Sequence, residues 1–360
     1  MMNSETLEMP RALDQDSQRH SVQRYYGEVL SSSRDLKTNA CCPPETLPAY
    51  LRDILAEIHP QVEDRFYGCG SPIPPAIEGA TVLDLGCGSG RDCYLLSKLV
   101  GPGGRVIGVD MTSEQLQVAQ RYRHYHATKF GYPSSNVAFI LGDIADLAAA
   151  GIADDSVDVV VSNCVINLTP DKGAVLREVF RVLKPGGEFY FSDVFADRRI
   201  AAPLAYDPVL LGECLAGALY VEDFRRFVTL AGCADARVCS RSPLTLDGDE
   251  VERRIGMVRF ESITYRAFKL ALEDRCEDYG QVAVYLGTLA HHPHRFTLDD
   301  HHLFERGRPM LVCGNTADML GRTRYAPYFE VRGEKRVHYG LFDCAPKATP
   351  TLPATSGRCC

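Results

Sequence analysis

The sequence lacks an uninterrupted apolar run of the roughly 18 residues that a membrane-spanning helix needs. It also lacks an excess of positive charge. The formal net charge is −8 and no basic stripe alternates with aromatic residues, so nucleic acid is not an expected partner. The first fifteen residues contain acids and no apolar segment, so no export or transit signal is expected there. These features predict a soluble, cytoplasmic protein that acts on a small molecule. A monomer is also expected.

Closely spaced cysteine pairs such as Cys-x-x-Cys are absent, although the chain contains 14 cysteines. Structural zinc sites use such pairs, so no metal cofactor is expected. A secreted disulfide framework is also excluded, because cytosolic reductants keep such bonds open. Five cysteines suit a packing role in the core: Cys87, Cys93, Cys233, Cys239 and Cys276. Packing does not explain two adjacent pairs, Cys41-Cys42 and Cys359-Cys360.

The length of 360 residues predicts two domains with additional segments. Residues 1–70 form a leader or lid with helical patterns over 17–30 and 47–58. Residues 71–200 alternate strand and helix patterns, which is typical of an α/β domain with a parallel sheet. The expected strands are residues 81–85, 105–109, 137–141, 157–162 and 188–194, and a helix is expected over 173–183.

The rest of the chain has a weaker pattern. Residues 201–246 are expected to be a helical segment, with a continuous helix over 203–231. Residues 247–345 predict a smaller mixed α+β domain. Residues 346–360 are rich in Pro, Thr, Ser and Gly and are predicted to be a disordered tail.

A glycine-rich turn follows the first expected strand, in the segment from Val82 to Gly90. Glycines at 86, 88 and 90 let the backbone approach a ligand, and the helix that follows offers free N–H groups. A dinucleotide fingerprint requires Gly-x-Gly-x-x-Gly, whereas the third glycine here comes two residues after the second. Asp84 lies ahead of the first glycine.

Polar residues follow the next three expected strands as well. Asp110 ends the second strand, Asp143 follows the third, and Asn163 and Cys164 follow the fourth. Ligands of open parallel sheets bind at the carboxyl ends of the strands, and an acid at the tip of the second strand suits a ribose diol. The four strand ends therefore predict a nucleoside-binding site.

This series resembles the class I methyltransferase pattern over residues 80–195, which implies a Rossmann-like fold and S-adenosylmethionine as methyl donor. The resemblance implies that the glycines hold the methionine part, that Asp110 binds ribose, and that Met111, Asp143 and Ile144 contact adenine. The full set of implied cofactor-binding residues is Tyr67, Asp84, Gly86, Gly88, Gly90, Asp110, Met111, Gln115, Gly142, Asp143, Ile144, Asn163 and Val165.

Three further cysteines lie in distinctive segments: Tyr67-Gly68-Cys69-Gly70, Asn163-Cys164 and Gly212-Glu213-Cys214-Leu215-Ala216-Gly217. Glycines beside Cys69 and Cys214 indicate backbone bent closely around a bound group. These segments, together with Cys42, Cys313 and Cys344, resemble the arsenite methyltransferase family. The resemblance implies arsenite and methylarsenite as substrates.

Soft thiolates select soft centres, and trivalent arsenic takes three sulfurs while it keeps a lone pair. The resemblance implies that Cys69, Cys164 and Cys214 bind arsenic, with Glu213 beside them, and that Cys42 is a fourth catalytic cysteine. It also implies that Cys42 forms a disulfide with Cys69 during turnover, which thioredoxin or glutathione reduces. A shift by one residue would make Cys41 the redox partner instead.

Two alternatives stay open from the residues alone. The chain is a methyltransferase for a small organic metabolite if its cysteines are incidental, in which case serine at 164 and 214 leaves activity intact. It is a thiol-based arsenic-binding protein without catalysis if the cofactor motifs are not used.

Overall fold

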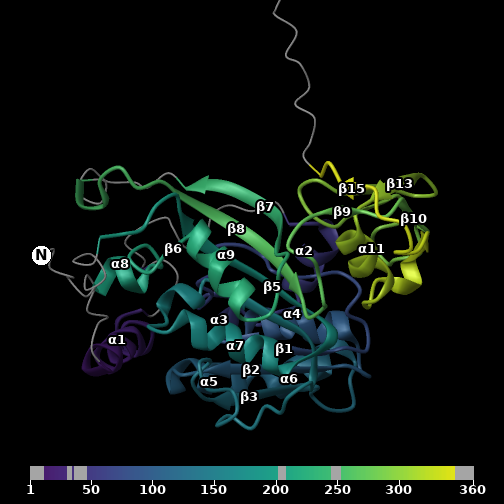
Figure 1. Cartoon of the computed structure of the whole chain (residues 1–360). Coiled ribbons are helices and arrows are strands. Elements are labelled where there is room, and N and C mark those ends of the chain that lie inside the picture. Colours follow the sequence, from purple (N-terminus) through teal and green to yellow (C-terminus); the bar gives the residue numbers. More distant parts are fainter. Residues whose placement is uncertain (1–11, 31–34, 36–46, 202–207, 245–252, 345–360) are drawn as a thin grey trace, which may run out of the picture.

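The structure is a computed structural model that describes residues 12–30, 35, 47–201, 208–244 and 253–344 (Figure 1). Cys41, Cys42, Cys359 and Cys360 lie outside the described residues, as does the tail that is predicted to be disordered. No helix within the described ranges has the length and apolar character needed to span a membrane.

A large sheet forms the centre of the molecule, with strand order β3-β2-β1-β4-β5-β8-β7 and with β6 beside β5 (Figure 1). The strands are β1 Thr81–Leu85, β2 Arg105–Asp110, β3 Val137–Leu141, β4 Val157–Asn163, β5 Leu183–Ala196, β6 Leu219–Tyr220, β7 Arg237–Leu244 and β8 Phe260–Phe268. The parallel arrangement predicted for the first five strands is confirmed. However, β8 pairs antiparallel with β5, and β7 antiparallel with β8, so the sheet is mixed.

Helices cover both faces of this sheet, which explains why β1 and β4 carry apolar residues on both faces. Alternate residues of a strand point to opposite faces, and Val82 belongs to one core while Leu83 and Leu85 belong to the other. The core around Val82 includes residues of α2 (Ala49–Leu55), α4 (Arg91–Val100) and α5 (Ser113–Arg121). The core around Leu83 includes residues of α7 (Lys172–Val182) and α9 (Val221–Leu230).

The leader contains α1 (Ala12–Arg24), which continues into a π-helical turn over Tyr25–Val29. The continuous helix predicted over residues 203–231 is wrong in its middle. The chain forms α8 (Pro208–Gly212), turns, adds β6 to the sheet and then forms α9. The φ angle of Cys214 is +65°, which a right-handed helix does not allow, so the helical run ends before it. Two glycines on either side of it also allow close contacts. A Cβ on Gly212 would lie 2.5 Å from the Tyr25 ring, and one on Gly217 would lie 2.0 Å from the carbonyl oxygen of Asn167.

The C-terminal part has its own small sheets, which lie beside the large sheet in yellow tones in Figure 1. Its elements are β9 Glu277–Asp278, β10 Gln281–Tyr285, β11 Arg295–Thr297, β12 Leu303–Glu305, β13 Pro309–Val312, α11 Gly314–Gly321, β14 Phe329–Arg332 and β15 Gly340–Leu341. Residues such as Phe296, Phe304 and Tyr325 form its core. The predicted boundary at residue 247 falls between β7 and β8, so both sides of it contribute strands to the large sheet.

Candidate functional site

A cavity with about 980 Å³ of empty space, part of it open to solvent, lies at the carboxyl edge of the parallel strands. Twelve of the thirteen residues predicted to bind the cofactor line it: Tyr67, Asp84, Gly86, Gly88, Asp110, Met111, Gln115, Gly142, Asp143, Ile144, Asn163 and Val165. The sequence therefore located this cavity from the ends of four strands.

The glycine-rich turn reaches the cavity through Gly86 and Gly88, both with positive φ. A Cβ on Gly88 would meet no atom within 4 Å, so the backbone there faces open space. Gly90 differs from the prediction because it is not among the residues that line the cavity. A Cβ on Gly90 would lie 2.8 Å from the ring of Phe139, so this glycine allows the start of α4 to pack against β3.

Asp110 is almost fully buried at the tip of β2, and its two carboxylate oxygens accept hydrogen bonds from different backbone groups. Gly88 N–H donates to Oδ2 and Thr112 N–H donates to Oδ1, each at 2.8 Å. Burial raises the pKa of Asp110, whereas these backbone donors act in the opposite direction. The carboxylate thus fixes the glycine turn and lines the cavity.

Helix α1 of the leader closes one side of the cavity. Arg19 Nε lies 3.1 Å from Asp143 Oδ2, and Gln23 Nε2 donates to the carbonyl oxygen of Met111 at 3.0 Å. Gln115 Nε2 donates in return to the carbonyl oxygen of Tyr26 at 2.9 Å. Arg19 and Tyr26 were not predicted to line the cavity. Their place on the predicted leader helix was the available signal, and it did not indicate which of its residues face the cavity.

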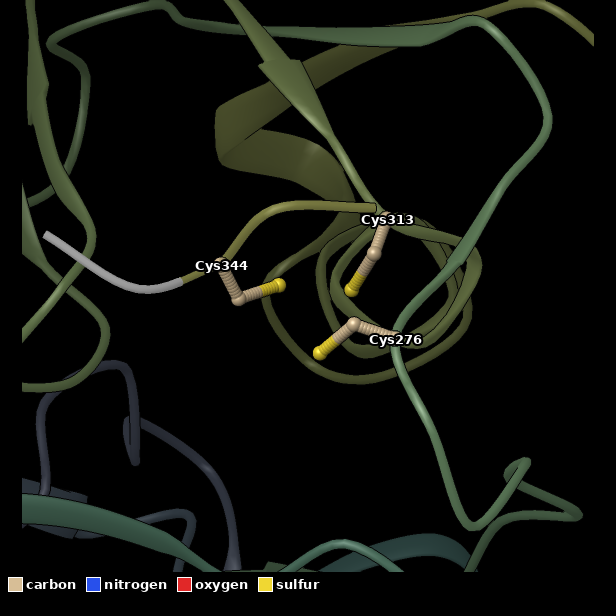
Figure 2. A group of neighbouring side chains, drawn as sticks. All are labelled: Cys276, Cys313 and Cys344. Atoms are coloured by element: carbon tan, nitrogen blue, oxygen red, sulfur yellow. The ribbon is translucent and has the colours of Figure 1, made fainter. Parts of the chain in front are cut away.

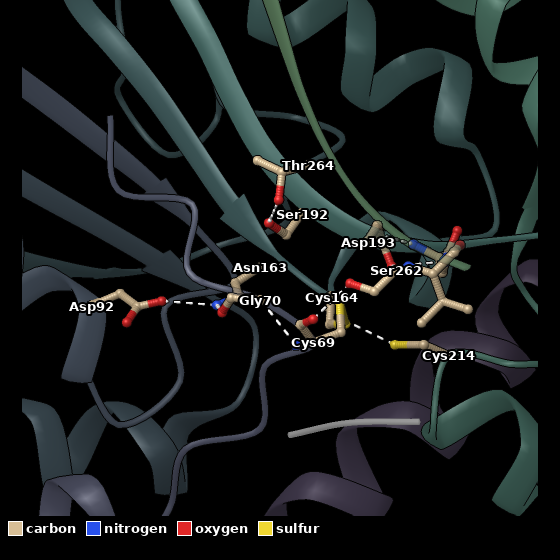
Figure 3. The surroundings of a disulfide bond; sticks show 12 residues. Cys69, Gly70, Asp92, Asn163, Cys164, Ser192, Asp193, Cys214, Ser262 and Thr264 are labelled. Atoms are coloured by element: carbon tan, nitrogen blue, oxygen red, sulfur yellow. Dashed lines mark hydrogen bonds between the residues drawn. A yellow bond between two sulfur atoms is a disulfide. The ribbon is translucent and has the colours of Figure 1, made fainter. Parts of the chain in front are cut away.

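The three cysteines predicted to bind arsenic lie together beside this cavity (Figure 3). Cys69 and Cys164 form a disulfide with an S–S distance of 2.03 Å. Cys214 donates from Sγ to the carbonyl oxygen of Cys164 at 3.1 Å. All three side chains are buried, and Cys164 lines the cavity. In this state Cys69 is bonded to Cys164 and not to Cys42, the partner that the family resemblance implied.

Asn163 holds the Cys69 segment against the sheet (Figure 3). Its Oδ1 accepts from Cys69 N–H at 3.1 Å, and its Nδ2 donates to the carbonyl oxygen of Gly70 at 2.8 Å and to Asp92 Oδ2 at 3.0 Å. Ser262 of β8 donates to the carbonyl oxygen of Cys69 at 2.7 Å. Close packing explains why residue 70 is a glycine, because a Cβ on Gly70 would lie 2.7 Å from the hydroxyl oxygen of Ser192.

Two buried acids lie near the sulfurs. Glu213, predicted from its segment, accepts a hydrogen bond from the Tyr25 hydroxyl at 2.9 Å. Asp193 was not predicted, and one of its carboxylate oxygens lies within 4.8 Å of both Cys69 and Cys164 sulfurs. Burial raises the pKa of Asp193 to about 7. An acid near the carboxyl end of strand β5, between Ser192 and Val194, was the available signal for this residue.

Comparisons with known proteins agree with this site. A family model described as a methyltransferase domain matches residues 77–232. Arsenite methyltransferase of Aquipseudomonas alcaligenes is 53% identical over 324 residues, which cover 90% of this chain and 93% of that protein. Arsenite methyltransferase of Homo sapiens is 44% identical over 320 residues, which cover 87% and 84%.

A crystal structure of an arsenic(III) S-adenosylmethionine methyltransferase from Chlamydomonas reinhardtii is also similar. It is 52% identical in sequence, gives a TM-score of 0.80, and the match covers 83% of this chain and all of that one. Together with the fold and the cysteine geometry, this agreement confirms the family predicted from the sequence. The chain therefore belongs to the arsenite methyltransferase family.

Proposed function

We propose that this chain transfers methyl groups from S-adenosylmethionine to trivalent arsenic held by Cys69, Cys164 and Cys214. The observation that carries the proposal is the convergence of these three sulfur-bearing residues beside the cavity at the strand ends. Relatives that cover about nine tenths of the chain and are named arsenite methyltransferases support the same reaction.

The cavity fits the proposed methyl donor. Gly88 leaves open backbone for the methionine part, and Asp110 offers a carboxylate at the tip of β2 for the ribose hydroxyls. Met111 and Ile144 supply apolar surface for adenine. When bound, S-adenosylmethionine supplies an electrophilic methyl group on its sulfonium. Arg19 and Gln23 of α1 hold the leader across the cavity and restrict the access of water.

Arsenic binding requires reduction of the Cys69–Cys164 disulfide, because a sulfur in a disulfide cannot also bind arsenic. With three thiols available, arsenous acid loses three hydroxyl groups as water and gains three S–As bonds. Arsenic held by these three sulfurs would keep its lone pair, and Cys164 lines the cavity in which S-adenosylmethionine would supply the methyl group. Positioning lowers the barrier to this displacement, and no general base is needed.

Methyl transfer uses the arsenic lone pair and formally oxidises arsenic by two electrons. The Cys42 thiol, on losing its proton, attacks the Cys69 sulfur, and the Cys69–As bond breaks with its electron pair returning to arsenic, which becomes trivalent again. We assign Cys42 and Cys69 to the disulfide that forms in this step. Thioredoxin or glutathione then reduces it through a mixed disulfide. The disulfide between Cys69 and Cys164 in the structure supports the view that Cys69 takes part in thiol exchange. In this proposal the enzyme acts as a monomer in the cytoplasm.

Substitution of a single arsenic-binding thiol tests the three-sulfur site. We expect Cys164→Ser and Cys214→Ser to lower the methylation rates of arsenite and methylarsenite by at least 100-fold, because two sulfurs do not orient the arsenic lone pair. Chromatography of labelled products measures both rates. Cys239→Ser, on strand β7 outside the site, is the matched control. Full activity of either variant would favour a small organic metabolite as the acceptor.

Cys42→Ser tests the relay separately. We expect this variant to methylate methylarsenite near the normal rate and to lose arsenite methylation, because the relay regenerates trivalent arsenic after the first transfer. Cys41→Ser is the control for the neighbouring thiol. Equal loss on both substrates, or loss in Cys41→Ser alone, would remove Cys42 from the relay.

A further inference from the structure

A second group of three cysteines lies in the C-terminal part of the chain (Figure 2). The sulfurs of Cys276, Cys313 and Cys344 all lie within 4.8 Å of one another. The three residues come from separate segments: Cys276 precedes β9, Cys313 lies between β13 and α11, and Cys344 follows β15. Figure 2 shows the three side chains turned toward a common point.

The packing role predicted for Cys276 does not fit this arrangement. Among the described residues, the hydrophobic core of the C-terminal part contains none of these three cysteines. Cys313 is fully buried, whereas Cys276 and Cys344 are half-buried, so the group is reachable from solvent on one side. Core filling therefore does not explain why three thiols meet here.

Backbone hydrogen bonds hold the segments of the group in place. Strands β9 and β15 pair through Glu277 and Leu341. Phe342 N–H donates to the carbonyl oxygen of Cys276 at 2.7 Å, and Cys344 N–H donates to that of Phe342 at 3.0 Å. The sulfurs are thus brought together before any ligand binds, which reduces the entropy cost of binding.

The surroundings of Cys313 favour a thiolate. Thr316 N–H of helix α11 donates to the Cys313 sulfur at 3.4 Å, and Arg237 Nη2 lies 3.7 Å from that sulfur. Donors and positive charge at a helix N-terminus stabilise a thiolate, which is the form that binds soft centres.

We propose that Cys276, Cys313 and Cys344 form a second binding site for trivalent arsenic, separate from the site beside the cofactor cavity. Binding converts arsenous acid and three thiols into three S–As bonds and three molecules of water, and arsenic stays trivalent throughout. Trivalent arsenic takes three sulfur ligands, which is the number of thiols in this group. Zinc prefers four ligands, and within the described ranges no fourth cysteine, histidine or carboxylate joins the group.

Arsenic stoichiometry tests this site. The full-length protein is reduced, dialysed to equilibrium against arsenite without S-adenosylmethionine, and analysed for bound arsenic by mass spectrometry. Each of Cys276→Ser, Cys313→Ser and Cys344→Ser is expected to lose one equivalent of arsenic per chain. The double variant Cys276→Ser/Cys344→Ser is expected to lose the same single equivalent, because all three thiols hold one atom. Cys239→Ser is the control and is expected to retain every equivalent.

Unchanged arsenic stoichiometry in Cys276→Ser and Cys344→Ser would overturn the proposal. Uptake of zinc in place of arsenic by the reduced protein would do the same. These two residues are half-buried, so the test stands even if Cys313→Ser fails to fold. Methylation by Cys344→Ser at saturating arsenite is expected to stay within about twofold of normal. The methylation rate distinguishes the two sites. If the proposed site beside the cavity were wrong, its variants would not affect methylation as expected, whereas the arsenic bound by Cys276, Cys313 and Cys344 would still be measured.

Discussion

At the scale of single residues, Cys164 and Cys214 are unusual in their backbone. Their φ angles are +56° and +65°, in the left-handed region that glycine normally occupies. Such a conformation costs about 1–3 kcal/mol for a residue with a side chain, and it persists only where the surroundings impose it. Both cysteines lie where a sulfur must reach the cavity region, so this strain coincides with the proposed arsenic site.

Asp110 is the residue whose role in cofactor binding can be measured most directly. Asp110→Ala removes the acceptor for the ribose hydroxyls and also the bonds that hold Gly88 and Thr112. Hydrogen bonds to a charged group contribute about 1.5–3 kcal/mol, so we expect S-adenosylmethionine to bind at least tenfold more weakly. Isothermal titration calorimetry measures the affinity. Arsenite binding should not change, and unaltered cofactor affinity would exclude the ribose role.

Apolar runs located the strand ends and so placed the cavity at this edge of the sheet, whereas the family resemblance supplied residues away from the strand ends, such as Tyr67 and Gln115. The sequence could not predict the pairing of Cys69 with Cys164, since spacing alone does not determine which cysteines meet. Asp193 and Arg19 were missed for a related reason. Their neighbours at the site come from distant parts of the chain, and only tertiary packing brings them together.

At the scale of elements, the five parallel strands were predicted within a few residues, apart from an earlier start of β5, because each contains a run of apolar residues. Strand β7 was missed since most of its residues are half-buried or exposed, which leaves little contrast between its two faces. The helical pattern over residues 203–231 did not indicate that Cys214 takes a positive φ, which a continuous helix does not allow. Gly212 and Gly217 allow close contacts with Tyr25 and Asn167.

Helix α1 is the element that closes the cavity, and its contact through Arg19 can be tested. The Arg19–Asp143 ion pair is partly exposed, and such pairs contribute about 0.2–1 kcal/mol. Arg19→Gln should therefore raise the KM for S-adenosylmethionine about two- to fivefold and leave kcat nearly unchanged in initial-rate assays. Arg24→Gln on the same helix removes only an exposed pair with Glu28 and serves as control. Equal effects of both variants would contradict a specific role for Arg19.

At the scale of the whole molecule, a buried ion network joins the large sheet to the C-terminal part. Glu188 of β5 is fully buried and pairs with Arg266 of β8 at 2.8 Å and with Arg324. The Tyr325 hydroxyl donates to Glu188 at 3.1 Å, and Arg266 Nη1 donates to the carbonyl oxygen of Leu298 at 2.6 Å. These contacts connect the hydrophobic core of the large sheet with the hydrophobic core of the C-terminal part.

Glu188→Gln should destabilise the fold by about 3–5 kcal/mol, because it leaves the buried charge of Arg266 without its partner. Urea unfolding followed by circular dichroism measures this change. Glu305→Gln breaks an exposed pair with Arg308 and should change stability by less than about 1 kcal/mol. If Glu188→Gln unfolds at the same urea concentration as the unsubstituted protein, the network does not hold the two parts together.

The side-chain amide of Asn163 contacts two segments that are far apart in the sequence. On one side it holds the backbone that carries Cys69, and on the other it reaches Asp92 in the first turn of α4, directly behind the glycine-rich turn. One side chain thus connects the segment proposed to bind arsenic with the helix that follows the glycine-rich turn. If both proposed sites are correct, a substitution at Asn163 would weaken arsenic binding and cofactor binding together.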